Sequence, residues 1–276
     1  METSNKILLY DDYCPLCTWY SAMFVKLGLL KPGNRVAFSS ADLSVLTAID
    51  IEKGKNEIPL YDTATYQTLY GIDALLEILG QKTPFIKQVG KLKPVNWLLK
   101  KLYKLISYNR KAIVAKKCSP GTFDCSPGFS AFYRIVFMIL FLFFNSVMLL
   151  PLHDHVFSQL SFYHLSYSQL QSGHLVFVGI NCLLAAFFSR RMAIEYLGQV
   201  NMLALVSILL LTILMLIVYA LPVSDWIVLF CLVLITAFII KEYFRRMKYA
   251  GILPRYKPVV LINLICLSLF LGYVFH

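Results

Sequence analysis

Residues 6–30 read KILLYDDYCPLCTWYSAMFVKLGLL, and this stretch decides the fold of the first part of the chain. The apolar run Lys6–Tyr10 is typical of a buried strand, and residues 15–30 have the length and composition of a helix. A second strand candidate follows at residues 35–39. Because strand, helix and strand alternate, we expect the two strands to pair in parallel.

The chain then continues with further short elements before it becomes strongly basic. We expect a polar helix at 41–50, a strand at 58–61, a turn at 62–65, a strand at 66–70 and a helix at 72–79. The order βαβ followed by ββα predicts a small α/β domain over residues 1–80.

Two cysteines stand at the junction between the first strand and the first helix. The helix N-terminus stabilises a thiolate and lowers the pKa of a thiol there, and Pro15 suits a first helical turn. Cys17 lies one turn further on, within reach of a mixed disulfide formed at Cys14. The sequence therefore predicts Cys14 as the nucleophile and Cys17 as the resolving thiol. Half of a zinc site and a pair of inert cysteines are the alternatives, but Cys-x-x-Cys in a βαβ unit favours redox chemistry.

Two further groups of residues have a chemical and a structural interpretation. Asp11 is a candidate proton acceptor during thiol exchange, or else it caps the cysteine helix. Cys118 and Cys125 are candidates for a second dithiol or for ligands that would complete a zinc site, although their spacing is wide for zinc. Residues of a simple turn before the membrane region are the alternative, and we predict no metal site.

The motif Asp11-x-x-Cys14-x-x-Cys17 resembles the signature of the DCC family of thiol-disulfide oxidoreductases, which have a thioredoxin-like fold. Residues 71–74 (GIDA) and Tyr103 with 109–110 (NR) resemble later landmarks of that family, so the similarity covers about residues 6–117. The resemblance implies an enzyme that exchanges dithiol for disulfide with a protein or small-molecule substrate. Its redox group would be the cysteine pair itself, with no other cofactor.

The resemblance also points to substrate contacts and to one departure from the family. Pro59 resembles the cis-proline that lies beside the active disulfide of thioredoxin-like folds, and an ordinary trans-proline at a strand start is the alternative. Pro15 is the second candidate for substrate binding. Asp12 stands where the family commonly has Gly, and a second carboxylate near Cys14 opposes thiolate formation.

The composition of the whole chain indicates a membrane protein. Hydrophobic residues make up 58% of its 276 residues, charged residues make up 15%, and the mean hydropathy is +0.66, which excludes a disordered chain. Five apolar runs are near the length that spans a bilayer. They lie at about 129–151, 174–189, 196–221, 222–240 and 258–275. The second run is short and contains Asn181, and without it the chain would have four spans.

The net charge of +11 is distributed unevenly along the chain. Residues 81–117 hold 11 Lys and Arg and no Asp or Glu, among apolar residues at helical spacing. This segment is either a helix on an anionic lipid surface or a solvated helix whose charges set the topology. No nucleic-acid-binding motif accompanies the charge, so we expect no nucleic-acid partner. With five spans, all the Lys and Arg residues of the head and the loops would lie on the same side of the membrane. Because basic loops face the cytoplasm, this predicts a cytoplasmic head and an external C-terminus.

Polar residues within the membrane region have structural interpretations that we favour. Asn145, Asn181, Asn201 and Asn263 are typical of hydrogen-bond partners between helices, and ligands to a quinone or another carrier are the alternative. The histidines of residues 153–174 fit an interfacial segment better than a metal or haem site.

Together these features predict a multi-span protein of the bacterial inner membrane with a thioredoxin-like oxidoreductase head. We expect a redox domain at 1–80, a basic juxtamembrane segment at 81–128 and an all-α bundle of about five helices at 129–276. The rival hypothesis is an assembly or interaction protein that keeps the head for binding only. A small transporter is a weaker alternative, because no charged residue lies in the middle of a span.

Overall fold

The structure is a computed structural model that describes residues 5–116 and 127–275. The chain forms two compact units, residues 1–133 and residues 134–276. We call the first unit the head and the second unit the bundle. The head contains a small sheet with helices, and the bundle contains long apolar helices.

The head is built on one mixed sheet of four strands in the order β2-β1-β3-β4. The strands are β1 (Lys6–Tyr10), β2 (Arg35–Ala37), β3 (Pro59–Asp62) and β4 (Gln67–Tyr70). β1 and β2 pair in parallel, whereas β1 with β3 and β3 with β4 are antiparallel. This is the βαβ and ββα order of a thioredoxin-like fold, so the fold class expected from the sequence is confirmed.

Alternate residues of the central strands supply the cores on the two faces of the sheet. Leu8 and Leu60 are buried against α1 (Pro15–Lys26) and α4 (Gly71–Leu79). Their neighbours Leu9 and Tyr61 belong to a second core, beside α2 (Leu43–Thr47) and α3 (Ile51–Asn56). Successive side chains of a strand point to opposite faces, which explains this division.

Two elements of the head end earlier than the sequence pattern suggests. α1 ends at Lys26 because Gly28 has a φ of +64°, which turns the chain so that Leu29 and Leu30 enter the core. β2 ends at Ala37, after which a short 3₁₀ turn buries Phe38 in the second core. The helix expected over 41–50 is divided, with α2 followed by a separate α3.

The basic segment expected as a separate part over residues 81–128 belongs to the head as far as it is described. It forms α5 (Pro84–Lys91) and α6 (Lys93–Val114), and α6 contacts α4, α5, α1 and α3. The Tyr103 hydroxyl of α6 accepts a hydrogen bond from the Ile58 backbone N–H over 2.8 Å. Burial of one face of α6 against the sheet unit is the reason that the 1–80 boundary is too short.

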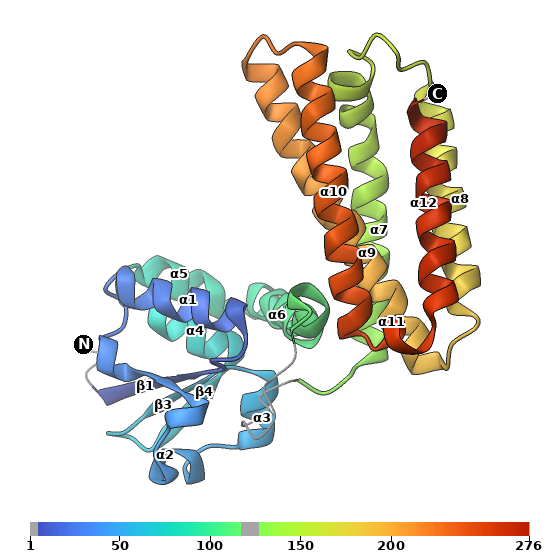
Figure 1. Ribbon diagram of the computed structural model, residues 1–276. Coiled ribbons are helices and arrows are strands. Elements are labelled where there is room, and N and C mark those ends of the chain that lie inside the picture. Colours follow the sequence, from blue (N-terminus) through green and yellow to red (C-terminus); the bar gives the residue numbers. More distant parts are fainter. Residues whose placement is uncertain (1–4, 117–126, 276) are drawn as a thin grey trace. The chain divides into compact units, whose positions relative to one another are not determined.

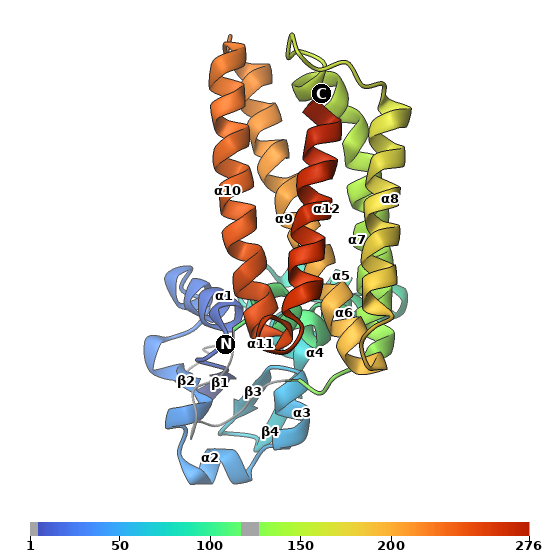
Figure 2. The ribbon, with the colours of Figure 1, turned by 45° about the vertical axis from the view of Figure 1, so that its right-hand side comes forward.

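The bundle holds five long helices, which lie side by side in Figures 1 and 2. They are α7 (Ala131–Leu152), α8 (Tyr167–Ala185), α9 (Arg190–Ala220), α10 (Asp225–Tyr249) and α12 (Lys257–Phe275), with a short α11 (Ile252–Arg255). Within the described residues, four helices are long and apolar enough to cross a membrane, at 131–157, 190–220, 225–249 and 257–274. α8 is more polar because it contains Gln169, Gln171 and His174, and it is the run that the sequence left least certain.

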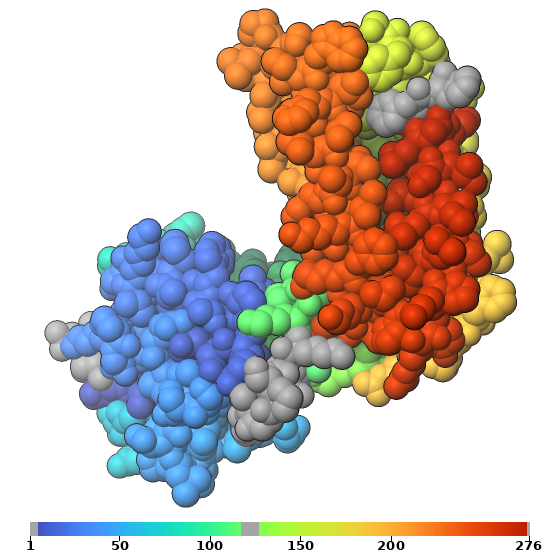
Figure 3. Space-filling model, viewed as in Figure 1, coloured from blue at the N-terminus to red at the C-terminus, as the bar shows by residue number. Residues whose placement is uncertain are grey.

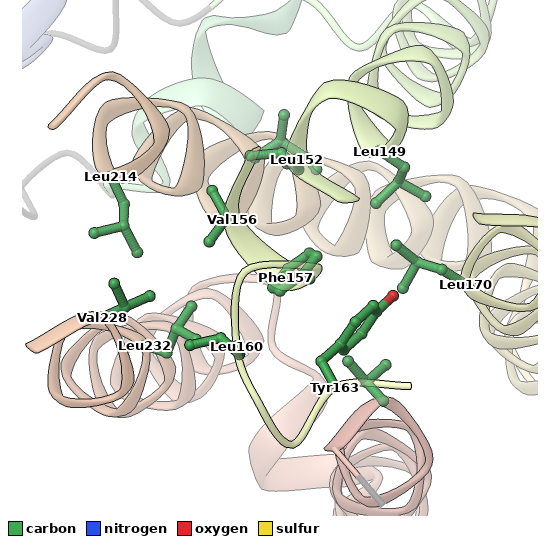
Figure 4. Close-up of a cluster of buried hydrophobic side chains, with 12 residues drawn as sticks. Leu149, Leu152, Val156, Phe157, Leu160, Tyr163, Leu170, Leu214, Val228 and Leu232 are labelled. Atoms are coloured by element: carbon green, nitrogen blue, oxygen red, sulfur yellow. The ribbon is translucent and has the colours of Figure 1, made fainter. Parts of the chain in front are cut away.

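The packing of the bundle separates an apolar interior from an apolar outer surface. Twelve buried hydrophobic residues, including Leu149, Phe157 and Leu232, pack together near the segment between α7 and α8 (Figure 4). On the outer surface, Phe230, Leu234 and Phe238 are exposed along α10 with a spacing of four residues. Figure 3 shows this helix in orange and α12 in red. Exposed apolar rows of this kind fit a hydrocarbon environment and indicate a membrane protein.

Most charged residues of the bundle gather at one of its ends. α7, α8, α9, α10 and α12 alternate in direction (Figure 2), so the starts of α7 and α9 share an end with the α10–α12 connection. Buried Arg246 donates hydrogen bonds to Glu242 and Gln199, both over 2.9 Å. Arg134 forms an ion pair with Glu195 over 3.4 Å. This end of the bundle is therefore polar and internally paired.

Candidate functional site

The cysteine pair lies at the N-terminal end of α1, just after the loop that follows β1. Cys14 is the N-cap residue of α1, Pro15 follows at its first position, and Cys17 lies one turn further on. Both thiols are free, but their accessibility differs, because Cys14 is partly exposed and Cys17 is only 1% exposed. Only Cys14 can therefore be reached by another molecule.

Arg110 brings a positive charge to the buried cysteine from the far end of α6. Its Nη1 donates a hydrogen bond to the Cys17 Sγ over 2.9 Å, and its Nη2 donates to the Lys55 carbonyl over 2.7 Å. Residues 109–110 resemble a family landmark, but the sequence predicts no role for Arg110. A separation of 93 residues leaves no local pattern that could reveal the contact.

When the cysteine pair ionises, the negative charge lies on the buried sulfur of Cys17. A hydrogen bond from the Cys14 thiol and the nearby Arg110 charge outweigh burial and lower the pKa of Cys17 to about 6. The same hydrogen bond, together with burial, raises the pKa of Cys14. The sequence led us to expect the lower pKa at Cys14, because of the helix N-terminus. The difference arises because Arg110 contacts the other sulfur, at which a full charge outweighs the partial charge of a helix end.

Asp11 holds the turn that leads into the cysteine helix, whereas its role as a proton acceptor stays a prediction. Its Oδ1 accepts hydrogen bonds from the backbone N–H groups of Tyr13 (3.0 Å) and Cys14 (3.2 Å), so it holds the turn before α1. Its Oδ2 lies 3.9 Å from Arg110 Nη1. Burial nevertheless raises the pKa of Asp11, which makes this carboxylate a better proton acceptor.

The remaining residues near the motif lie as follows. The Asp12 carboxylate accepts a hydrogen bond from the Ser39 hydroxyl over 2.8 Å. Tyr20 also donates a hydrogen bond to Cys17. It lies three residues after Cys17 on α1, and helical spacing could have suggested the contact. Trp19 is 64% exposed and points away from the core.

The two prolines proposed to contact substrate have different positions. No cis peptide bond occurs in the described residues, so Pro59 is a trans-proline and the cis-proline expectation is wrong. Pro59 opens β3, where a missing N–H is tolerated, and it is buried. Pro15 is exposed beside Cys14.

The other candidate ligands do not gather in the part of the chain that the structure describes. Cys118 and Cys125 lie outside the described residues. Within 5–116 and 127–275, no group of three or more His, Cys, Asp or Glu side chains is placed to hold a metal ion. His153 instead contacts Asp154 and the Leu165 carbonyl, at 2.7 and 3.1 Å, and so braces the segment between α7 and α8.

A small cavity of about 30 Å³ lies beside Cys14. Asp11, Tyr13, Arg110, Lys111 and Lys116 are among its lining residues. Three cations and one carboxylate give the opening next to the accessible sulfur a net positive charge.

The head matches a known family of proteins. Residues 8–116 match the family model of DCC1-like thiol-disulfide oxidoreductases, which confirms the family resemblance over the head. No curated protein and no solved structure matches the chain. The head thus has the fold and the family signature of a thiol-disulfide oxidoreductase, and the chain continues into apolar helices that could cross a membrane.

Proposed function

We propose that the protein is a membrane-anchored thiol-disulfide oxidoreductase that acts through Cys14 and Cys17. The hydrogen bond from Arg110 to the Cys17 sulfur carries this proposal. A guanidinium that donates a hydrogen bond to a cysteine sulfur stabilises the thiolate form, which a cysteine that only fills space does not need. The bundle anchors the head and has no assigned step in the reaction.

The accessibility of the two sulfurs supports Cys14 as the attacking thiol and Cys17 as the resolving thiol in the reduction of a disulfide substrate. The Cys14 proton passes along the existing hydrogen bond to Cys17, and the Cys14 thiolate attacks one substrate sulfur. The substrate S–S bond breaks, a mixed disulfide with Cys14 forms, and the first substrate thiolate leaves. Asp11 then accepts the proton from Cys17, and the Cys17 thiolate attacks the Cys14 sulfur. The second substrate thiolate leaves, and the cysteine pair is oxidised by two electrons.

Two features support further parts of the proposal. The basic end of the bundle would face the cytoplasm by the positive-inside rule, and a bacterial inner membrane is the setting we propose. In a reducing cytoplasm the head would act as a reductant, and a thiol or dithiol donor would restore the pair. The positive opening beside Cys14 favours a disulfide substrate that carries carboxylates.

A mixed-disulfide trap tests the proposal. Cys17→Ser should accumulate a covalent adduct at Cys14, because no resolving thiol remains, whereas Cys14→Ser should accumulate none. Cys182→Ser in the bundle is the matched control and should behave like the wild type. Adducts would be separated by non-reducing electrophoresis and assigned by mass spectrometry. A head that only binds partners would give no adduct in Cys17→Ser and would keep its cellular function in both single variants.

We also propose that the outer face of α6 contacts lipid. Trp97, Leu98, Leu102 and Ile106 are 45–63% exposed on this helix, among several lysines. A protein with Trp97 as its only tryptophan (Trp19→Phe, Trp226→Phe) would be placed in nanodiscs that contain brominated phosphatidylglycerol. Quenching of Trp97 is expected. In a protein with Trp19 as its only tryptophan, the brominated lipid should not quench the fluorescence. Equal quenching in the two single-tryptophan proteins would refute the contact.

A further inference from the structure

Two adjoining cavities of about 260 and 210 Å³ lie between the helices of the bundle. Both are lined by residues of α7, α8, α9, α10 and α12, and they share Asn145, His174 and Ser207 among other residues. Because they share walls, we treat them as one space, which we call the bundle cavity. Its combined size falls within the range of small-molecule sites.

Several polar atoms face the bundle cavity without a protein partner. Asn145 is fully buried, and neither its Nδ2 nor its Oδ1 has a hydrogen-bond partner among the residues that the structure describes. The same holds, within those residues, for His174 Nε2 and Asn201 Nδ2. Most buried polar groups in folded proteins are paired, so a cluster of unpaired groups around one space needs a physical explanation.

A second polar cluster of the bundle, formed by Tyr196, Asn181 and Asn263, is hydrogen-bonded between helices. The Tyr196 hydroxyl donates to Asn181 Oδ1 over 2.7 Å, and Asn263 Nδ2 donates to the Tyr196 hydroxyl oxygen over 2.6 Å. Asn181 and Asn263 are therefore hydrogen-bond partners between helices, as the sequence suggested. Asn145 and Asn201 have no such bond among the described residues, so the interhelical interpretation does not account for them.

The lining of the bundle cavity defines the chemistry of a matching ligand. It contains no Asp, Glu, Lys or Arg, and apolar side chains such as Leu142 and Val178 form most of the wall. A charged ligand would therefore be poorly solvated there. The Asn145 amide offers both a donor and an acceptor, while the Asn201 amide offers a donor. A neutral molecule with carbonyl or hydroxyl oxygens and a hydrocarbon body would satisfy these atoms.

We propose that the bundle cavity binds such a neutral, lipid-soluble carbonyl or hydroxyl compound, with Asn145 as the central hydrogen-bonding residue. Asn145 of α7, His174 of α8 and Asn201 of α9 all line the same space. Binding would pair the buried amide that the protein itself leaves unpaired. The site is independent of the cysteine pair and requires no redox step.

Calorimetric titration of the full chain in dodecylmaltoside tests the proposal. The probes are decylubiquinone, which carries carbonyl oxygens, its reduced form, which carries hydroxyls, and undecylbenzene, which has a ring and chain but no oxygen. Saturable binding of either oxygenated probe, at least tenfold tighter than that of undecylbenzene, is expected. Asn145→Leu should weaken this binding at least tenfold and leave the Tm equal to or above that of the wild type.

Additional variants keep the test decisive. Asn201→Leu should weaken binding several-fold even if Asn145→Leu does not fold. Val147→Leu changes an exposed residue of α7 and should bind like the wild type. Equal binding of all three probes would mean partition into apolar space alone, and no binding at all would mean that water occupies the cavity. Either result, or full binding by Asn145→Leu, would overturn the proposal.

Discussion

The Nη1 atom of Arg110 lies 2.9 Å from the Sγ atom of Cys17, although the two residues belong to helices at opposite ends of the head sequence. The contact fixes where the charge of the cysteine pair rests, because the guanidinium stabilises a thiolate on the buried sulfur. Cys14 keeps the access to substrate and Cys17 keeps the charge. The sequence predicts that Cys14 has both the access to substrate and the low pKa. In the structure, Cys14 has the access and Cys17 has the low pKa.

Loss of the Arg110 charge should raise the pKa of the cysteine pair. For Arg110→Gln we expect the titration midpoint near pH 6 to move up by about one to two units, since a hydrogen bond to a charged group contributes about 1.5–3 kcal/mol. Iodoacetamide modification, followed for the cysteine peptide by mass spectrometry from pH 5 to 10, measures the midpoint. Lys111→Gln removes a neighbouring cation and should shift it much less. Equal midpoints in Arg110→Gln and the wild type would contradict the assignment.

The low pKa of Cys17 predicts how the stability of the reduced protein depends on pH. The pKa of this thiol is about 6 in the folded protein against 9.0 for an ordinary cysteine. A folded-state pKa below the unfolded value contributes stability above the unfolded pKa, and this contribution is lost as the pH falls through about 6. The Tm of the reduced protein should therefore rise from pH 6 to pH 8.

Two comparisons isolate the effect of Cys17. Cys17→Ser has no thiol to ionise at this position, so its Tm should rise less over the same interval. The oxidised protein, in which Cys14 and Cys17 form a disulfide, should also lack the increment. Thermal unfolding in detergent, with and without a reductant, measures both. Identical slopes in the reduced wild type and Cys17→Ser would show that the charge is not on Cys17.

Tyr103 should stabilise the head through a single hydroxyl group. Tyr103→Phe leaves the Ile58 N–H without its 2.8 Å partner, and a buried unpaired donor costs about 1–3 kcal/mol. We expect a lower Tm of the head transition in Tyr103→Phe. Tyr66→Phe is the matched control, because Tyr66 is 78% exposed and its change should leave the Tm unaltered. Equal losses in the two variants would argue against the hydrogen bond.

The buried ion pair at the polar end of the bundle should matter more than the ion pairs on the surface of the head. Arg246 is 3% exposed, so Glu242→Gln leaves a buried charge with a weaker partner and should destabilise the bundle by up to about 3–5 kcal/mol. Glu52→Gln breaks the exposed pair with Lys55, which contributes at most about 1 kcal/mol. The Tm values in detergent should separate the variants, and a smaller loss in Glu242→Gln than in Glu52→Gln would contradict this account.

Local patterns in the sequence determined the elements and the membrane character of this protein. The apolar run Lys6–Tyr10 and the Cys-Pro-Leu-Cys segment place β1, the start of α1 and the cysteine pair, since strand periodicity and helix-end chemistry depend on neighbouring residues. The apolar runs likewise located the long helices, because the length of a hydrocarbon core is a local requirement. α8 remained uncertain, since its polar residues face groups on helices that the sequence does not place.

Tertiary structure alone decided which groups act together. Arg110 reaches Cys17 because α6 packs against the sheet unit, and no periodicity predicts a contact across 93 residues. The thiolate therefore resides on a different sulfur from the one that helix-end chemistry favours. In the bundle, four asparagines look alike in sequence and all four line the same cavity. Asn181 and Asn263 are hydrogen-bonded there, whereas buried polar atoms of Asn145 and Asn201 have no partner among the described residues. This difference depends on which side chains lie within reach of each amide, and that is fixed only when the helices pack.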